Sequence, residues 1–120
     1  SWSSLVNLGA PINTPYDEDA PFITADGMTM YFSSKGHNSM GGFDIFKSQK
    51  DADKWSSPIN LGRPFNTPGE DIYFILANNG NKAYYSSSAL AVDGSNDMDI
   101  YSVDFCVVPT ASNRQPADRF

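Results

Sequence analysis

The chain has few of the residues on which enzymatic and metal chemistry depend. Its 120 residues include one cysteine and one histidine. Cys106 has no partner for an internal disulfide, so no disulfide framework is indicated. A nucleophilic site would need a serine or cysteine activated by His37, and no strand-to-helix nucleophile elbow is present to hold one. A lone histidine also makes no typical zinc site. We therefore predict that the chain is not an enzyme.

Positive charge is also scarce. Eight Lys and Arg stand against 14 Asp and Glu, and the formal net charge is −6. The basic residues are dispersed, whereas phosphate binding needs them clustered, so we expect no nucleic-acid partner and no docking on anionic lipid. There is no run of about 18 apolar residues and no signal peptide. We expect no membrane insertion, with any targeting segment encoded outside this stretch of chain.

Helix-favouring residues are few. Glutamate occurs only at Glu18 and Glu70, while Asp, Asn, Ser, Gly and Pro are abundant. The apolar positions are aromatic or β-branched as often as leucine. This composition favours strands and turns over helices, and we predict an all-β fold.

The sequence repeats itself once. Residues 2–15, WSSLVNLGAPINTP, return as residues 55–68, WSSPINLGRPFNTP, at an offset of 53 residues, the separation of Trp2 from Trp55. The match continues from YFSS at 31–34 to YYSS at 84–87 and, after a two-residue insertion, from DIF at 44–46 to DIY at 99–101. Such a period is typical of repeat architectures, in which each unit buries its apolar face against a neighbour.

Each copy carries the same order of strand signals. Asp26-Gly27 in the first copy and Asn79-Gly80 in the second supply the positive φ angles of tight hairpins between a first and a second strand. A third and a fourth strand follow. The predicted strands are residues 20–24, 28–33, 43–48 and 55–61 in the first copy and 72–76, 83–86 and 98–103 in the second.

Four short antiparallel strands per repeat are typical of a β-propeller blade. We predict two four-stranded antiparallel blades that form a partial ring or part of an oligomeric ring. The predicted boundaries are repeats over 1–106, with a blade-closing strand at 2–8, blade one at 17–61 and blade two at 70–104, and a tail or linker at 107–120. Two blades leave edges and apolar faces uncovered, so we expect self-association or packing against other chains.

These motifs resemble a known family. The Asp26-Gly27 turn, the YFSS segment and the loop and strand GHNSMGGFDIF at 36–46 are similar to TolB-type, WD40-like propeller repeats of Bacteroidetes envelope proteins. The NLGxP segments resemble the version that sits beside an OmpA-like domain. The resemblance implies a periplasmic or outer-membrane-associated module for binding or scaffolding of a protein partner, in some relatives linked to type IX secretion and gliding. Peptidoglycan would be contacted only through a domain outside this chain.

Strand connectivity predicts where a partner binds. Connections in an antiparallel meander alternate between the two ends, which brings loops 10–18, 35–42, 63–71 and 88–97 to one end. Long loops on a rigid scaffold are where recognition usually occurs. The second copy departs from the pattern, because residues 88–97 replace the glycine- and histidine-rich loop. The predicted partner-binding residues are His37, Asn38, Ser39, Met40 and Arg63.

The alternative for residues 36–42 is a glycine-rich turn that merely satisfies its own backbone. We weigh the two equally on sequence alone.

Acidic residues at the start of each copy offer a possible cation site. Asp17, Glu18 and Asp19, with Glu70 and Asp71 of the second copy, would form an acidic ring if first strands line a channel. The interpretation that we favour is that these carboxylates accept hydrogen bonds from loop NH groups.

A second possible cation site, calcium in particular, lies in the loop before the last strand. Asp93, Asp97 and Asp99 have the close spacing of a calcium loop, but the bidentate glutamate of an EF-hand is missing. A polar turn is favoured here, and we predict no cofactor.

Other repeated residues are expected to be structural. They are Trp2, Trp55, Asp44, Asp99, Gly27 and Gly80. The tryptophans are expected to be packing anchors and the aspartates hydrogen-bond acceptors. If the tryptophans instead stack on sugars, the chain is a carbohydrate- or glycan-binding propeller, which is the alternative function. The exposure of Trp2, Trp55, Tyr16 and Tyr73 separates the two.

Overall fold

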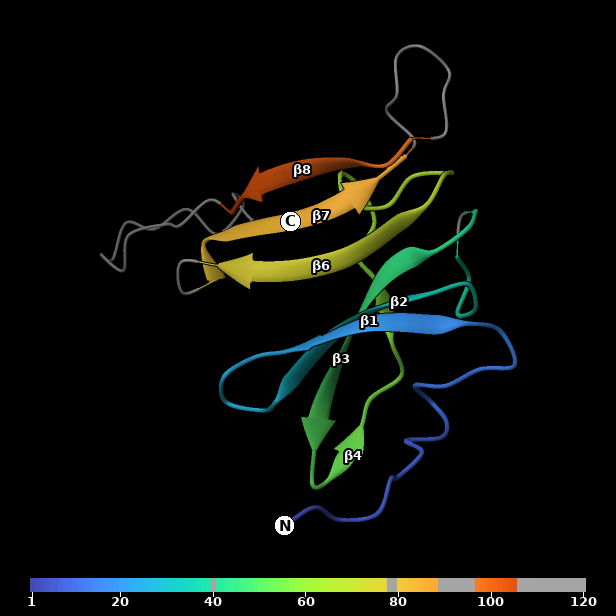
Figure 1. Cartoon of the computed structure of the whole chain (residues 1–120), viewed down its shortest axis with the longest axis vertical. Coiled ribbons are helices and arrows are strands. Elements are labelled where there is room, and N and C mark those ends of the chain that lie inside the picture. The colour runs from blue at the N-terminus through green and yellow to red at the C-terminus, as the bar shows by residue number, and fades with distance from the viewer. Residues whose placement is uncertain (40, 78–79, 89–96, 106–120) are drawn as a thin grey trace.

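A computed structural model of the chain describes residues 1–39, 41–77, 80–88 and 97–105. These residues form two antiparallel sheets and no helix, which confirms the all-β prediction (Figure 1). The strands are β1 (Glu18–Ile23), β2 (Thr29–Ser34), β3 (Asp44–Asp51), β4 (Lys54–Trp55), β5 (Ile59–Asn60), β6 (Asp71–Ala77), β7 (Lys82–Ser87) and β8 (Asp99–Asp104). Over the described part of the chain, nothing helical is long and apolar enough to cross a membrane. The predicted tail at 107–120 lies outside the described residues.

The first sheet contains the first copy of the repeat. Its order is β1-β2-β3-β4, and β5 also pairs with β3. A continuous fourth strand over 55–61 was expected, but residues 56–58 separate β4 from β5. Pro58 has no NH for a ladder hydrogen bond, which accounts for a break at this point. The fourth position of the sheet is thus filled by two short strands that both pair with β3.

The second sheet has the order β6-β7-β8, and its strands match the three predicted at 72–76, 83–86 and 98–103. A fourth strand, which the predicted four-stranded blade requires, is not found beside them among the described residues. Residues 2–8, predicted as a blade-closing strand, form no strand. They are exposed, and Trp2 is 99 % accessible, so the expected packing of Trp2 is not found. A closing strand needs a third-strand partner like β3, and the described part of the chain places no such strand beside residues 2–8.

The two copies fold alike in detail. Both first strands carry a bulge, between Asp19 and Phe22 in β1 and between Ile72 and Ile75 in β6. The residue inside each bulge has a positive φ, 53° at Ala20 and 64° at Tyr73. A bulge with a left-handed residue bends its strand and increases the local twist. The repeat therefore encodes the same irregular backbone twice.

A core joins the two sheets. Its buried members are Ile45, Phe65, Phe74, Ala83 and Tyr85. Tyr31 of β2 packs on Phe74 of β6 with ring centroids 4.5 Å apart. A second cluster lies within the first sheet and consists of Ile12, Met30, Phe32 and Phe46, with Trp55 packed against it.

The repeated tryptophans give a matched pair of stability variants. Trp55 is half-buried against the second cluster, with Lys50 Nζ 5.6 Å from its ring centroid. Trp55→Ala should lower the free energy of unfolding by about 1.5 to 3 kcal/mol, less than a fully buried tryptophan would. Trp2→Ala should change it by less than about 0.5 kcal/mol, because Trp2 is exposed. Urea unfolding followed by circular dichroism measures both, and equal losses would contradict this assignment.

Candidate functional site

The NLGxPxN segment forms the same turn in both copies. In the first, Asn7 Oδ1 accepts from Gly9 N at 2.7 Å and from Asn13 Nδ2 at 3.0 Å. In the second, Asn60 Oδ1 accepts from Gly62 N at 2.7 Å and from the Asn66 amide at 2.7 Å. The two glycines have φ of 66° and 70°, a conformation that disfavours other residues. The repeated asparagines thus stabilise the turn through hydrogen bonds within it.

The second-copy turn also holds the two sheets together. Asn66 is fully buried, and its side-chain amide pairs with the main chain of Ile45 in β3. Ile45 N donates to Asn66 Oδ1 at 2.6 Å, and Asn66 Nδ2 donates to Ile45 O at 2.8 Å. Asn66 therefore supplies hydrogen bonds to the side of β3 that faces away from β2, as the main chain of a further strand would.

Acidic residues close the loops that follow these turns. Glu18 accepts hydrogen bonds from Thr14 N at 3.1 Å, from the Thr14 hydroxyl, and from Ser34 Oγ at 2.8 Å. Asp71 accepts from Thr67 N at 2.8 Å and from Thr67 Oγ1. The favoured interpretation of these carboxylates, as acceptors for loop NH groups, is confirmed for both.

The electrostatics of Asp71 follow from its burial. Desolvation raises the pKa of its carboxyl, the hydrogen bonds from Ser87 and Thr67 oppose that rise, and the nearby Asp44 adds to it. Asp44 is also buried, and its Oδ2 accepts from Asn60 Nδ2 at 3.1 Å. Asp44 thus acts as a hydrogen-bond acceptor, while its counterpart Asp99 is exposed.

The loop between β2 and β3 is wedged between the two acid-closed loops. A Cβ on Gly41 would lie 1.8 Å from the Pro68 carbonyl oxygen, and one on Gly42 would lie 2.0 Å from a Glu70 carboxylate oxygen. Phe43 N donates to that carboxylate at 2.9 Å. Loops 10–17, 35–43 and 63–70 thus meet at one end of the sheets, which we call the loop end. It lies on the right in Figure 1.

The predicted partner-binding residues differ in how they are placed. His37 is half-buried, with Nε2 donating to Ile12 O at 2.8 Å and the ring 5.4 Å from that of Phe46. Ser39 is half-buried and donates to Lys35 O at 3.0 Å. Asn38 and Arg63 are exposed, and Met40 lies outside the described residues.

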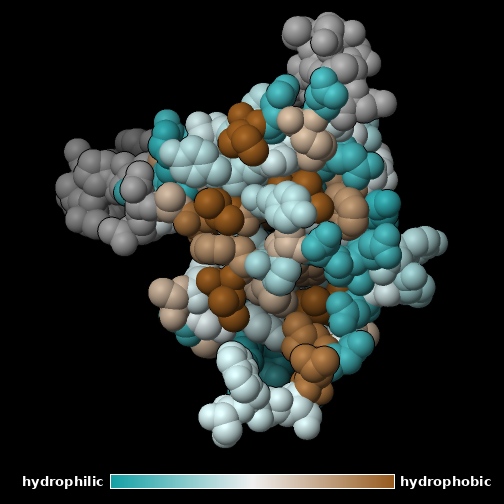
Figure 2. Space-filling model, viewed as in Figure 1, coloured by the Kyte–Doolittle hydropathy of each residue, from teal (hydrophilic) through white to brown (hydrophobic). Residues whose placement is uncertain are grey.

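A groove at the loop end brings two of these residues together. It is lined by residues 10–11, 13–15, 37–38 and 57–58 and has a volume of about 450 Å³. Three of its residues are prolines, which hold their φ fixed. We call it the proline groove. Figure 2 shows hydrophilic side chains gathered over the loop end, on the right of this face. Arg63 is not among the lining residues.

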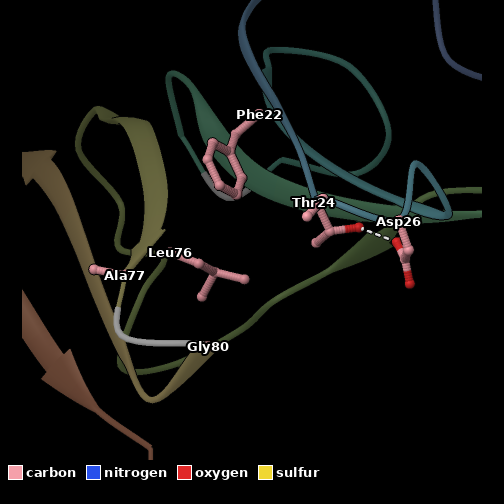
Figure 3. Close-up of a pocket in the computed structure, with 7 residues that line it drawn as sticks. Phe22, Thr24, Asp26, Leu76, Ala77 and Gly80 are labelled. Carbon is pink, nitrogen blue, oxygen red and sulfur yellow. Dashed lines mark hydrogen bonds between the residues drawn. The ribbon is translucent and has the colours of Figure 1, made fainter.

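A second hollow, which was not anticipated from the sequence, lies at the opposite end of the sheets, beside the tight hairpins. About 500 Å³ in volume, it is lined by residues 22, 24–26, 76–77 and 80. Figure 3 shows Phe22 of β1 and Leu76 of β6 projecting toward this space, and the hydrogen bond of 2.7 Å from Thr24 Oγ1 to Asp26 Oδ1. The only signal in the sequence was the repeated hairpin, which predicts two neighbouring turns at this end.

Metal ligands are not clustered in the described part of the chain, where no three of the His, Cys, Asp and Glu side chains are placed to share an ion. The possible calcium site at Asp93 lies outside the described residues, although Asp97 and Asp99 do not. No protein-family model, curated protein or solved structure was found to match this chain.

Asn13 and Asn66 hold equivalent places in the two turns, but substitution by alanine should lower the free energy of unfolding by unequal amounts. Asn66→Ala should lower the free energy of unfolding by about 2 to 3 kcal/mol, because it leaves the buried NH of Ile45 without a partner, although Ile45 O keeps the hydrogen bond from Leu61 N. Asn13→Ala should cost about 1 kcal/mol or less, because the hydrogen bond from the Asn13 side chain to Asn7 lies at the surface. Chemical denaturation of dilute protein distinguishes them, and a larger loss for Asn13→Ala would contradict the assignment.

Asp71 predicts a pH dependence. Its pKa is raised above the ordinary 3.8, so the folded protein binds this proton more tightly than the unfolded chain does. The contribution of Asp71 to stability is therefore full below pH 3.8 and declines as the pH rises through its raised pKa. The free energy of unfolding of the wild type minus that of Asp71→Asn should fall as the pH rises above 3.8, measured by urea unfolding. A difference that rises with pH would contradict this.

Proposed function

We propose that the two sheets are consecutive blades of a β-propeller and that the chain is a non-catalytic binding and scaffolding module. The support is the repeat of strand order, bulge and turn in both copies, because such recurrence is typical of propeller blades. The resemblance to TolB-type envelope repeats supports a periplasmic or outer-membrane-associated location.

The observation that carries the binding proposal is the proline groove. Its walls come from three separate segments, and two of them are fixed to each other, because His37 bonds to Ile12 O and Gly36 packs against Thr14. A rigid concave surface loses little conformational entropy when a partner binds. Exposed Asn38 offers hydrogen bonds at the rim of the groove, and Pro15 and Pro58 offer apolar contact. These are the features of a site for an extended segment of a partner protein.

A non-catalytic role agrees with how the one histidine is used. Its Nε2 donates to a main-chain carbonyl, and its ring packs near Phe32 and Phe46. His37 ties the loop between β2 and β3 to the turn that contains Ile12.

Site-specific photocrosslinking tests the groove. A benzophenone amino acid at Ser57, which lines the groove and is exposed, should crosslink an envelope protein in cells that express this protein. The same group at exposed Ala25, at the hairpin end, is the matched control and should not. Crosslinks of equal yield from both positions, or from Ala25 alone, would place the partner elsewhere.

Asn38→Gly supplies an independent test with the purified partner. Asn38 has a φ of 66°, which glycine adopts without strain, so this variant removes the amide and keeps the backbone. Its affinity for the crosslinked partner should fall at least roughly tenfold, about 1.4 kcal/mol, while the thermal midpoint stays unchanged. Unchanged affinity would assign the loop to structure alone, as the glycine-turn alternative holds.

Glycan binding is a second candidate function. Trp2, Tyr16 and Tyr73 are exposed, as an aromatic platform for sugars requires, whereas Trp55 is half-buried. The exposed tyrosines are not repeated, since the other copy has Gly69 and Ala20 at their positions. Binding of soluble cell-wall glycan by the wild type and its loss in Tyr16→Ala would favour this candidate over the protein partner.

A further inference from the structure

Ile45 of β3 is fully buried, at 0 % exposure, in the core that joins the two sheets. That core also contains Phe65, Phe74, Ala83 and Tyr85, and Leu61 packs against it. Its main chain pairs with the Asn66 amide. One strand residue thus makes both an apolar and a polar contact with the neighbouring copy of the repeat.

The first sheet has an open pocket at the equivalent place. Its lining includes Leu8, Ile12, Asn13, Pro21, Met30 and Phe32, around a volume of about 170 Å³. At the repeat offset, these six residues correspond one by one to Leu61, Phe65, Asn66, Phe74, Ala83 and Tyr85. We call it the Ile12 pocket. An apolar cavity of about 150 Å³ holds a molecule the size of benzene, so one aliphatic side chain fits.

The counterpart of Ile45 is equally exposed to solvent. Ile100 stands at the same place in β8, opposite Ser86 as Ile45 stands opposite Ser33. Its exposure is 72 %, against 0 % for Ile45. β8 pairs with β7 and forms the edge of its sheet (Figure 1). The chain therefore presents at one end the residue that the pocket at its other end is shaped to receive.

We propose that Ile100 of one copy of this chain inserts into the Ile12 pocket of a second copy, head to tail. The internal contact between the sheets supplies the geometry: Asn13 of the second copy pairs with the main chain of Ile100, as Asn66 pairs with that of Ile45. This contact goes beyond the binding function proposed above, because it uses neither the proline groove nor its partner.

Hydrogen bonding along the strand edge extends the same match. Within the chain, β5 pairs with β3, and Asn60 Nδ2 donates to Asp44. Across two copies, residues 6–7 would take the place of β5 on β8, and Asn7 would donate to Asp99. Asn7 is already braced by Gly9 and Asn13 as Asn60 is braced by its own turn. Strand addition of this kind orders residues 2–8, which form no strand in the single chain.

A head-to-tail contact can repeat from copy to copy, because each copy carries both halves of it. Heterologous interfaces give rings where the rotation between copies closes and open filaments where it does not. Each copy carries a net charge of −6, so like-charge repulsion opposes the contact. Added salt screens that repulsion and should strengthen the association.

Sedimentation of the full chain tests the proposal. At tens of micromolar the wild type should associate, and Ile100→Asp should weaken the association at least roughly tenfold. Ile59→Asp is the matched control, because Ile59 is 64 % exposed and is not part of the proposed contact. A wild type that stays monomeric, or an equal loss in both variants, would overturn the proposal.

Cysteine crosslinking keeps the test independent of any charge placed on β8. In a Cys106→Ser background, protein carrying Asn13→Cys is mixed with protein carrying Ile100→Cys under mild oxidation. The mixture should give a disulfide-linked heterodimer, whereas Asn13→Cys mixed with Ile59→Cys should not. If Ile100→Cys alone dimerises faster than the mixture reacts, β8 pairs with a second β8 and the head-to-tail contact is wrong.

Discussion

The pairing of the Asn66 amide with the main chain of Ile45 is the interaction on which the arrangement of the two sheets depends. The amide accepts from Ile45 N and donates to Ile45 O, and it is held in that orientation by Asn60. A buried amide that meets all these partners is worth far more than one that leaves a polar group unpaired. Around it, Phe65 and Phe74 exclude water from Ile45. Ile45 of β3 is therefore held both by hydrogen bonds to its main chain and by apolar packing around its side chain.

The contact between Asn66 and Ile45 also helps to hold the loop end in place. The turn that presents Asn66 leads through Thr67 to Asp71, and Asp71 N donates to Phe43 O at 2.8 Å. That places the second-copy loop directly against the loop between β2 and β3, where a Cβ on residue 41 would collide with the Pro68 carbonyl oxygen. The first-copy loop packs on the other side, through Gly36 and the His37 bond to Ile12. The proline groove is thus positioned by the same repeated turn that joins the sheets.

Much of the fold was predictable because the same strand and turn motifs occur in both copies of the repeat. The hairpins at Gly27 and Gly80 have the positive φ that the Asp-Gly and Asn-Gly pairs predict, 73° and 87°. The roles of Glu18 and Asp71 were also anticipated. The different surroundings of equivalent residues could not be predicted from the sequence. Trp2 and Trp55 are the same residue at the same place in the repeat, yet only Trp55 has a third strand to pack on. Asn13 and Asn66 differ for the same reason, as do Ile100 and Ile45. His37 was expected as a recognition residue, but its bond to Ile12 O joins positions 25 residues apart, which no local pattern encodes.

One contact of the repeat is formed within the chain, at Ile45, and its counterpart at Ile100 is left open. Amide hydrogen exchange at these two residues, read by NMR over a range of protein concentrations, measures this difference. Protection at Ile45 should be high at every concentration, because its NH is bonded to Asn66. Protection at Ile100 should be low in dilute protein and rise with concentration as Asn13 of a second copy binds it. Fast exchange at Ile45, or an Ile100 rate that does not change with concentration, would contradict the account.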